Sequence, residues 1–195
     1  GYQTAYSNTT GGRNSYVGYR TGYSNTTGGR NTFYGYKSGF FNTSGTRNIF
    51  VGHRAGFANT TGHYNTFTGY DVGRSNTDGA GNTITGYEAG NDNVSGNYNI
   101  FLGYQAGYSE TTSNKLYIEN SNSSSPLIYG EFDNDLVQIN GSLSVTNGFA
   151  DADSDTKIQV EESSDEDIIR FDMGGTEFMR LDSGRIEVLN TGGSV

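Results

Sequence analysis

The acidic residues with the clearest metal-binding spacing in this sequence lie near position 150. Four of them occupy positions one, three, five and twelve of a short segment, which is the ligand spacing of an EF-hand calcium loop. The candidate calcium ligands are Asp151, Asp153, Asp155 and Glu162. Position six is Thr156, although the sharp turn of such a loop needs glycine, and Lys157–Glu161 has the pattern of a strand rather than a helix. The sequence therefore favours an acidic linker, and calcium is the only cofactor that stays open.

Groups suited to catalysis are sparse. The chain has no cysteine and two histidines, so few side chains can act as a nucleophile or a general base. Carboxylates crowd Glu161–Asp167, and a carboxylate pair is the machinery of glycoside hydrolysis. They fall in an expected hairpin turn with no aromatic cradle for a sugar, while His53 and His63 replace other residues in a repeat, as surface variants do. We therefore expect no enzymatic activity.

Threonine and asparagine offer two further interpretations. Adjacent threonines, such as Thr26 and Thr27, point to opposite faces of a strand, whereas a flat ice-binding array needs Thr-x-Thr. Asn25-Thr26-Thr27 also fits an N-glycosylation sequon. Glycosylation explains only one of two asparagine columns in the repeat, and use in turns and ladders explains both.

These residues belong to a seventeen-residue unit that recurs without insertion from Gly1 to about Ser113. Its consensus is G-Y-x-x-G-Y-x-N-T-T-G-x-x-N-T-F-x. The seven copies begin at Gly1, Gly18, Gly35, Gly52, Gly69, Gly86 and Gly103. Such strict spacing means that each copy is one rung stacked on the next. A stacked repeat presents the same residues along a line, which suits a fibre or an extended surface better than a catalytic pocket.

Each copy predicts two strands and two turns, which make one rung of a parallel β-roll. The stronger strand is Asn-Thr-Phe-x-Gly-Tyr, as in residues 48–53 and 99–104, and a shorter strand surrounds Asn-Thr-Thr. Glycines at repeat positions five and eleven are expected to be turn residues, which are able to take positive φ. Side chains alternate along a strand, so the phenylalanine faces one side and its two neighbours face the other.

Identical residues fall above one another when rungs stack at about 4.8 Å. Each amide in a column can donate to the next and accept from the last, so an asparagine column satisfies itself. The first expected asparagine ladder is Asn8, Asn25, Asn42, Asn59, Asn76 and Asn93. The second is Asn14, Asn31, Asn48, Asn65, Asn82 and Asn99. The expected aromatic column is Phe33, Phe50, Phe67 and Phe101.

The repeat decays after Tyr108, and the rest of the chain predicts antiparallel β structure. We expect three regions, namely a seven-rung roll over 1–114, an antiparallel connector over 115–146, and an acidic linker with a β-meander over 147–195. The connector strands are expected at 116–118, 127–129, 136–139 and 143–145, and the meander strands near 157–161, 168–172, 177–181 and 185–189. The predicted fold class is all-β, a parallel β-roll or solenoid followed by hairpin and meander modules within a homo-oligomeric fibre.

A two-strand rung is thin and carries apolar side chains on both faces. A monomer covers one face and leaves the other in water, and an exposed apolar stripe of that length usually marks an interface. We therefore expect identical chains to associate in parallel and in register around a common axis. The expected interface residues are Tyr19, Val51, Tyr70, Leu102 and Tyr104.

The net charge and the hydropathy of the sequence limit the kinds of partner that the chain is expected to bind. The net charge is −9, and residues 120–195 hold four Lys or Arg against fifteen Asp or Glu. This balance argues against nucleic acid, whose binding needs a basic face. No apolar run approaches the roughly 20 residues that span a bilayer, so we expect no membrane insertion by this segment. The chain begins at the head of a repeat and without methionine, so we expect it to be a segment of a longer protein.

At this point the motifs are recognisable as a set. The segment Gly18–Gly28 resembles the tandem repeats of large secreted fibre and adhesin proteins of gliding Bacteroidetes-type bacteria. Leu116–Gly141 is similar to the module that precedes the chaperone domain of tail-fibre-like proteins, and 157–190 is similar to the spacer between their repeat blocks. The resemblance covers nearly the whole chain.

The resemblance implies an extracellular or cell-surface location, export by the type IX secretion route, and a homo-oligomeric adhesive fibre of the grappling-hook type. Trimeric autotransporter heads make a trimer the default by analogy, whereas the hook-like resemblance favours a larger ring, such as a heptamer. The implied partners are further copies of the chain, and surface glycans or another cell's surface. The alternatives are a phage-type tail fibre or tailspike that binds or cleaves polysaccharide, and a calcium-binding adhesin module.

Overall fold

The computed structural model describes residues 1–144, 149–150, 157–160, 168–173, 176–182 and 185–188. Every regular element in these residues is a β-strand, and none of them forms a helix long and apolar enough to cross a membrane. The chain divides into two compact units, Gly1–Gly141 and Ser142–Val195, each of which is described by itself.

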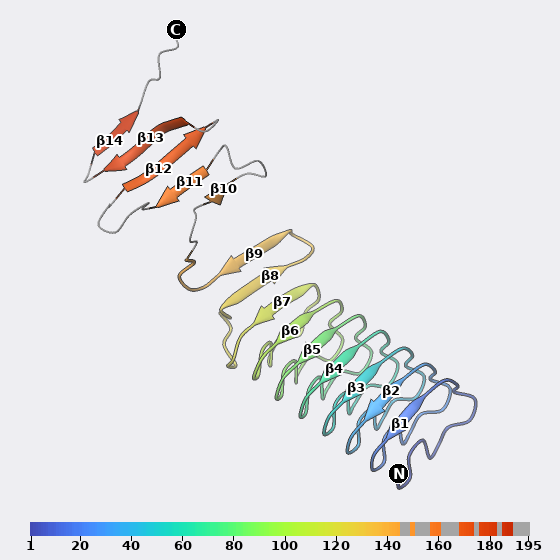
Figure 1. Ribbon diagram of the computed structural model, residues 1–195. Coiled ribbons are helices and arrows are strands. Elements are labelled where there is room, and N and C mark those ends of the chain that lie inside the picture. Colours follow the sequence, from blue (N-terminus) through green and yellow to red (C-terminus); the bar gives the residue numbers. More distant parts are fainter. Residues whose placement is uncertain (145–148, 151–156, 161–167, 174–175, 183–184, 189–195) are drawn as a thin grey trace. The chain divides into compact units, whose positions relative to one another are not determined.

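Six short parallel strands stack along the first unit as the wall of a β-solenoid (Figure 1). Among these six, each strand pairs in register with its neighbour seventeen residues along the chain, as Phe33 pairs with Phe50. The six strands are β1 (Ser15–Val17), β2 (Thr32–Tyr34), β3 (Ile49–Val51), β4 (Thr66–Thr68), β5 (Thr83–Thr85) and β6 (Ile100–Leu102). The prediction of an all-β parallel solenoid is therefore confirmed.

Each of these rungs contains one strand, where the sequence predicted two. In the Asn-Thr-Thr stretch of the first rung, the N–H groups of Thr9, Thr10 and Gly11 all donate to the carbonyl oxygen of Thr26, at 2.9, 3.1 and 3.2 Å. Successive residues of a strand point their N–H groups to opposite sides, so three donors that converge on one acceptor exclude a strand here. The prediction of a second strand was wrong, although the stretch is still hydrogen-bonded to the next rung.

The turn glycines act for two different reasons. At repeat position five, Gly56 has a φ of 58°, as expected for a turn glycine. At position eleven, Gly45 is not among the residues with positive φ, and a Cβ there would lie 2.4 Å from the carbonyl oxygen of Gly62. The turn glycine at position eleven therefore does not use its freedom to take positive φ, and glycine is needed there for the close approach of two rungs. Positive φ occurs instead at position one, where Gly52 has a φ of 140°.

A column of apolar side chains fills the solenoid. The rings of Phe33, Phe50 and Phe67 are stacked, with centroids 4.7 and 5.0 Å apart. Ile84 takes the same position in the next rung and Phe101 follows, and all five side chains are almost completely buried. Small side chains complete this core, namely Ala55, Val72, Ala89 and Ala106. In β3 and β6 the residues on either side of the phenylalanine are partly or well exposed, as the alternation predicted.

The sheet continues beyond the sixth strand with a change of register and then of direction. Strand β7 (Lys115–Ile118) pairs parallel to β6, but Ile100 lies opposite Leu116, so this copy is one residue shorter than the others. Strands β8 (Ile128–Glu131) and β9 (Leu136–Ile139) then add in antiparallel pairing. The assignment of β7 to a purely antiparallel connector was therefore wrong, because one of its edges extends the parallel stack.

The boundary expected after residue 114 is not a boundary of the fold. Nine strands form one sheet, and the compact unit that contains it ends at Gly141. A fourth connector strand was expected at 143–145, but Leu143 and Ser144 are not in a strand, and Val145 lies outside the described residues.

The second unit contains a five-stranded antiparallel sheet in which consecutive strands are neighbours. Its strands are β10 (Phe149–Ala150), β11 (Lys157–Val160), β12 (Ile168–Met173), β13 (Thr176–Asp182) and β14 (Arg185–Val188). The candidate calcium ligands Asp151, Asp153, Asp155 and Glu162 lie outside the described residues, as does the whole carboxylate-rich segment 161–167.

Candidate functional site

The first asparagine ladder runs along the inside of the solenoid. The side-chain amide of Asn42 donates to the amide oxygen of Asn25 at 2.7 Å, and Asn59 donates to Asn42 at 2.8 Å. The same bond links Asn25 to Asn8 and Asn76 to Asn59. Each of these donors also bonds a backbone carbonyl three residues later, so the column closes its own turns as well as joining rungs.

This ladder stops before its expected last member. Asn93 is buried, but neither polar atom of its amide has a hydrogen-bond partner among the described residues, and the amide oxygen of Asn76 also lacks one. The next rung is the shortened copy, in which Glu110 stands at the asparagine position. An ionised carboxylate has no hydrogen to donate, so it cannot continue a donor–acceptor ladder.

The second asparagine column has a different bonding pattern from the one expected. The amide oxygen of Asn48 accepts the backbone N–H of Asn65 at 2.9 Å, and its Nδ2 donates to the carbonyl oxygen of Gly62 at 2.8 Å. The pattern of an amide oxygen accepting the next rung's N–H recurs from Asn14 through Asn99. These side chains therefore tie backbone to backbone, and one direct amide-to-amide bond, between Asn82 and Asn65 at 3.1 Å, accompanies them.

A threonine hydroxyl ladder was missed by the sequence interpretation. Thr26 Oγ1 donates to the carbonyl oxygen of Thr43 at 3.0 Å, and Thr43 repeats the bond to Thr60 at the same distance. The signal was visible as an almost invariant threonine at repeat position nine. The outer face also carries Thr-x-Thr on two neighbouring strands, Thr66–Thr68 and Thr83–Thr85. An array of two strands is short, and it is flanked by Val51 and Ile100 on the adjacent strands.

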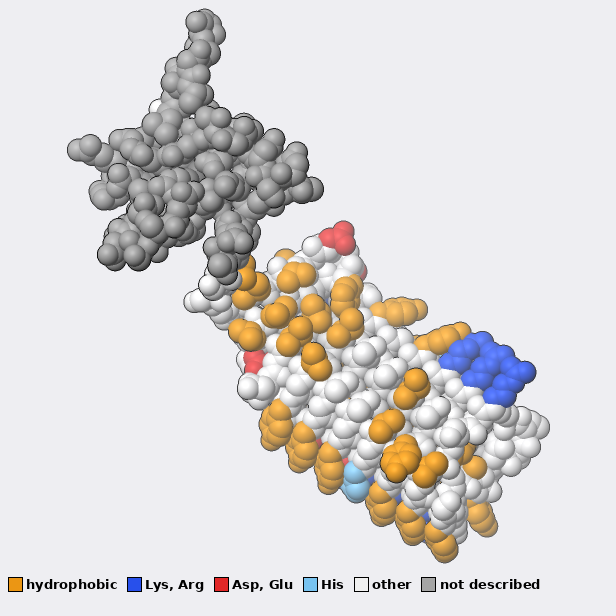
Figure 2. Space-filling view, viewed as in Figure 1, with side chains coloured by type: hydrophobic (Ala, Val, Ile, Leu, Met, Phe, Trp, Pro, Cys, Tyr) orange, Lys and Arg blue, Asp and Glu red, His pale blue; other side chains and the backbone are white. Residues whose placement is uncertain are grey.

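An unbroken stack of seven partly exposed rings runs along the solenoid at repeat position two. Neighbouring ring centroids are 4.5–5.3 Å apart and their planes lie within 9° of parallel. The rings, called the tyrosine ladder below, are Tyr2, Tyr19, Tyr36, His53, Tyr70, Tyr87 and Tyr104. Figure 2 shows a row of hydrophobic side chains along one edge, with a histidine within it.

The residues expected to form an interface fall on repeat positions seventeen and two, which flank the glycine that begins each copy. Tyr19, Tyr70 and Tyr104 belong to the tyrosine ladder, and their exposed fractions are 38%, 42% and 51%. Val51 and Leu102 are the last residues of β3 and β6, where Leu102 is 47% exposed and Val51 is half-buried. These five side chains therefore lie at the surface, next to the exposed face of the sheet.

Repeat position three carries a row of charged and polar side chains. The Arg54 guanidinium bonds the carboxylate of Asp71, with Nε–Oδ1 at 2.8 Å, and this hydrogen bond raises the pKa of Arg54. Asp71 is 4% exposed and also lies 3.4 Å from Nδ1 of His53. The histidine ring is already stacked between Tyr36 and Tyr70, so the cluster links rungs and presents no nucleophile.

Two tyrosine–glutamate contacts close the end of the stack. Tyr117 donates to Glu110 at 2.9 Å, and burial followed by this bond raises the pKa of the tyrosine. Burial also raises the pKa of Glu110, but hydrogen bonds from Thr112 and Tyr117 outweigh it, so the pKa lies below its ordinary value. These groups cap the last rung, where the first asparagine ladder has ended.

A second contact joins β7 to β8. Lys115 Nζ lies 2.9 Å from the carboxylate of Glu131, which also accepts a hydrogen bond from Tyr129. The tyrosine hydroxyl, the ammonium and the amide of Asn134 lower the pKa of Glu131 to about 2. The carboxylate is therefore ionised at neutral pH and serves to hold the antiparallel extension onto the solenoid.

Within the described ranges, no group of three or more His, Asp or Glu side chains is placed to hold a metal ion. The expected calcium ligands are beyond those ranges, and the structure brings no carboxylate pair and sugar-binding cradle together in the part it describes. The described residues instead form columns of equivalent side chains. Some columns satisfy hydrogen-bonding groups in the interior, and others repeat along the surface.

Comparisons of the chain with protein-family models, with curated proteins and with solved structures found no match.

Proposed function

We propose that this chain is a structural segment of an extracellular, homo-oligomeric fibre that adheres to surfaces or to other cells. The observation that carries the proposal is the tyrosine ladder, an unbroken row of partly exposed rings along the solenoid. A soluble monomer rarely exposes a long apolar row, and rows of this kind usually mark an interface.

The energetics of a repeated contact favour a fibre. Each apolar surface element removed from water contributes about 25 cal/mol per Å², and the same element recurs at every rung. The loss of translational and rotational freedom costs about 4–15 kcal/mol but is incurred once per added chain. A weak contact per rung therefore becomes a strong interface when parallel chains align in register, because the favourable term grows with the number of rungs.

The interface also needs the exposed face of the sheet. Val51 and Leu102 extend the apolar surface beyond the ring row, so a neighbouring chain buries the last residue of such a strand together with the ring two residues later. Closed rotation about a common axis gives every chain the same contact, and the default is a trimer, with a larger ring as the alternative. The solenoid itself acts as a stiff spacer, because its rungs are joined by ladders at every level.

The mass of the intact assembly tests the fibre. The double variant Tyr70→Glu/Tyr104→Glu places carboxylates in the tyrosine ladder and should lower the mass measured by sedimentation toward that of one chain. The matched control is Tyr64→Glu/Tyr98→Glu, which changes two tyrosines that are 53% and 65% exposed but lie outside the ladder. A wild-type chain that sediments as a monomer at micromolar concentration would refute the proposal.

The release of sugar reducing ends distinguishes an adhesive fibre from an enzyme that cleaves polysaccharide. An adhesive fibre immobilised on a surface should retain cells or surface glycans without releasing sugar reducing ends. A tailspike-type enzyme would release reducing ends continuously, and replacing its paired carboxylates by amides would abolish the release.

A further inference from the structure

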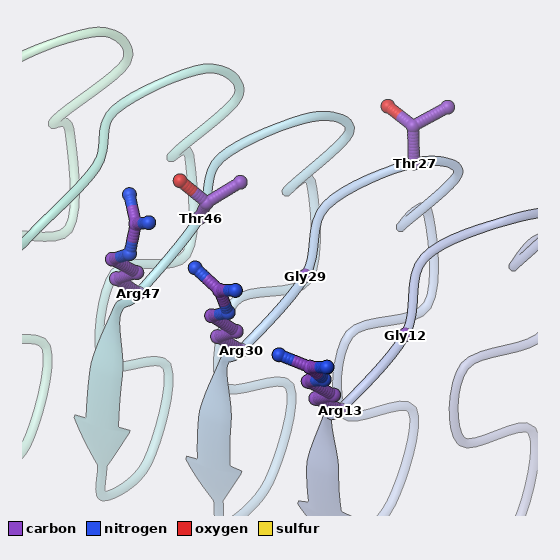
Figure 3. Close-up of a pocket in the computed structure, with 7 residues that line it drawn as sticks. All are labelled: Gly12, Arg13, Thr27, Gly29, Arg30, Thr46 and Arg47. Carbon is purple, nitrogen blue, oxygen red and sulfur yellow. The ribbon is translucent and has the colours of Figure 1, made fainter.

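Three arginines occupy the same repeat position on three successive rungs, two residues before the start of strands β1, β2 and β3. Arg13, Arg30 and Arg47 are all exposed, and Figure 3 shows their side chains extending from neighbouring rungs toward the same side. Together with Gly12 and Gly29 they line an open pocket of about 380 Å³. These three side chains are called the arginine column below.

The charge of the arginine column is not balanced by acidic residues of its own rungs. None of the carboxylates that the structure describes forms an ion pair with Arg13, Arg30 or Arg47. Residues 1–70 contain six Lys or Arg and no Asp or Glu, so no acidic residue of these rungs balances the charge. Like charges on neighbouring rungs repel one another, so the column is a place where a bound anion is favoured.

The backbone at this position accepts glycine in place of arginine. Arg13, Arg30 and Arg47 have φ values of 63°, 60° and 58°, in the left-handed region where residues with a Cβ are strained. Gly81 fills the same position three rungs after Arg30, with a φ of 71°. Tyr64 and Tyr98 share this conformation at the same position, with φ values of 60° and 57°, so the left-handed backbone is a property of the position and does not require arginine.

The end of the column is fixed by an aromatic ring. The guanidinium of Arg47 lies 5.0 Å from the ring centroid of Tyr64 and donates a hydrogen bond to its hydroxyl. Stacking leaves part of the planar donor fork free for an oxyanion, and guanidinium groups bind carboxylate and sulfate oxygens in bidentate fashion. The column is therefore partly preorganised at one end.

We infer that the arginine column binds a linear polysaccharide that carries carboxylate or sulfate groups. The donors repeat at the rung spacing, which the stacked rings place at about 5 Å, so they suit a polymer whose acidic groups recur along its length. The hydroxyls of Thr27 and Thr46 line the same pocket and are suited to sugar hydroxyls. The inference specifies the partner of the adhesive function proposed above and rests on it for its biological role.

Single-stranded nucleic acid suits this surface less well. Its binding sites combine a basic groove with aromatic side chains on which successive bases stack. The lining residues Gly12, Gly29 and Thr46 carry no ring, and the ring at the end of the column, that of Tyr64, already packs against Arg47. Polar hydroxyls and bare backbone beside the guanidinium groups favour a hydrated sugar polymer.

The test measures binding of the full chain to heparin and to polygalacturonate, with dextran as the neutral polymer and oligo-dT as the nucleic acid. The variant Arg13→Gly/Arg30→Gly should weaken binding to the acidic polysaccharides by at least about tenfold, because two charge-assisted contacts are lost. Its thermal midpoint should not fall, because glycine is unstrained at these φ values. Loss of binding can therefore be separated from loss of folding.

The matched control is Arg20→Gly/Lys37→Gly. It removes the same charge from neighbouring rungs, at residues whose φ values of 51° and 52° are also left-handed, but which lie over tyrosine and phenylalanine rings at another repeat position. The control should keep its affinity within about twofold. An equal loss in both variants would overturn the inference in favour of non-specific attraction.

Comparison of the four polymers identifies the anionic group that the arginine column binds. Binding to both acidic polysaccharides supports the inference for either anion, whereas binding to heparin alone assigns sulfate and to polygalacturonate alone assigns carboxylate. Stronger binding to oligo-dT, or binding to dextran that the variants do not change, would overturn it. The assembly's mass is measured separately, so failure of the fibre proposal and failure of this site give different results.

Discussion

Replacing Asn48 by alanine tests whether the second asparagine column holds the rungs together. The substitution removes two hydrogen bonds of a completely buried side chain, one to the carbonyl of Gly62 at 2.8 Å and one from the N–H of Asn65 at 2.9 Å. The two partners respond differently. The Gly62 carbonyl keeps its bond from Asn59, whereas the N–H of Asn65 is left buried without an acceptor.

The expected cost follows from this asymmetry. A lost hydrogen bond whose partner remains paired costs about 1 kcal/mol, and an orphaned buried donor costs about 1–3 kcal/mol. Asn48→Ala should therefore destabilise the solenoid by about 2–4 kcal/mol. Since a stacked repeat can open one interface at a time, the effect should concentrate at the rung that carries the substitution.

Hydrogen exchange at the amide of Asn65 is the most direct assay. Exchange there should accelerate by about 30- to 1000-fold relative to the wild type, which is the same free energy expressed as a ratio. Urea unfolding followed by circular dichroism reports the global loss, and Asn122→Ala is the control, because Asn122 is exposed and should change stability by less than about 0.5 kcal/mol. A change in Asn48→Ala no larger than in that control would refute the ladder argument.

The variant Asn48→Asp adds a pH signature to the same site. A protonated carboxyl can donate to the Gly62 carbonyl as the amide does, but an ionised one cannot and is also buried. The folded-state pKa of the new carboxyl should therefore be raised, so its stabilising effect is present at low pH and is lost as pH rises through that pKa. Unfolding midpoints should fall from pH 4 to pH 7 more steeply than in the wild type.

Two further predictions concern a glycine and a carboxylate. Gly52→Ala should destabilise the solenoid by about 2–5 kcal/mol, from overpacking and backbone strain together. The added Cβ would lie 1.9 Å from the next rung's carbonyl oxygen, and the φ of Gly52 is 140°. Urea unfolding measures the loss, and Gly12→Ala is the control, because a Cβ there meets nothing within 4 Å. Tyr129 and then Lys115 lower the pKa of Glu131 from 4.5 to about 2, so its stabilisation is present above pH 4.5 and is lost as pH falls toward 2. The difference in melting temperature between wild type and Glu131→Gln should shrink across that window, and a constant difference would contradict the assignment.

Much of the solenoid could be predicted from periodicity alone. A residue that recurs every seventeen positions must lie above its equivalent if the copies stack, so the parallel register of β1–β6 and the alignment of Phe33 over Phe50 follow from counting. The exposed flanks of each phenylalanine follow from the alternation of a strand. These features depend on position along the chain and need no knowledge of how the backbone turns.

The candidate sites were predicted less completely. The ring row at position two was visible as a repeated tyrosine, but its continuity through His53 depends on the stacking of unlike rings. The arginine column was present as Arg13, Arg30 and Arg47, yet nothing in their spacing indicates a left-handed backbone or a shared pocket. Charge recurs in many surfaces, and only the structure shows that these three side chains line one pocket and form no ion pair with the described carboxylates.

Periodicity is enough to predict that this chain stacks as an all-β repeat, because an unbroken period can be read directly from the linear sequence. The three-dimensional structure was needed to show that each rung has one strand and that Gly45 is required by a close contact with the next rung rather than by a turn. It was also needed to show that the Asn48 side chain bonds backbone groups rather than another side-chain amide. It also decided that the sheet runs on into β9. These outcomes depend on the directions of the backbone N–H and carbonyl groups. Those directions follow from the packing of neighbouring rungs, because each backbone group that is buried between rungs needs a hydrogen-bond partner.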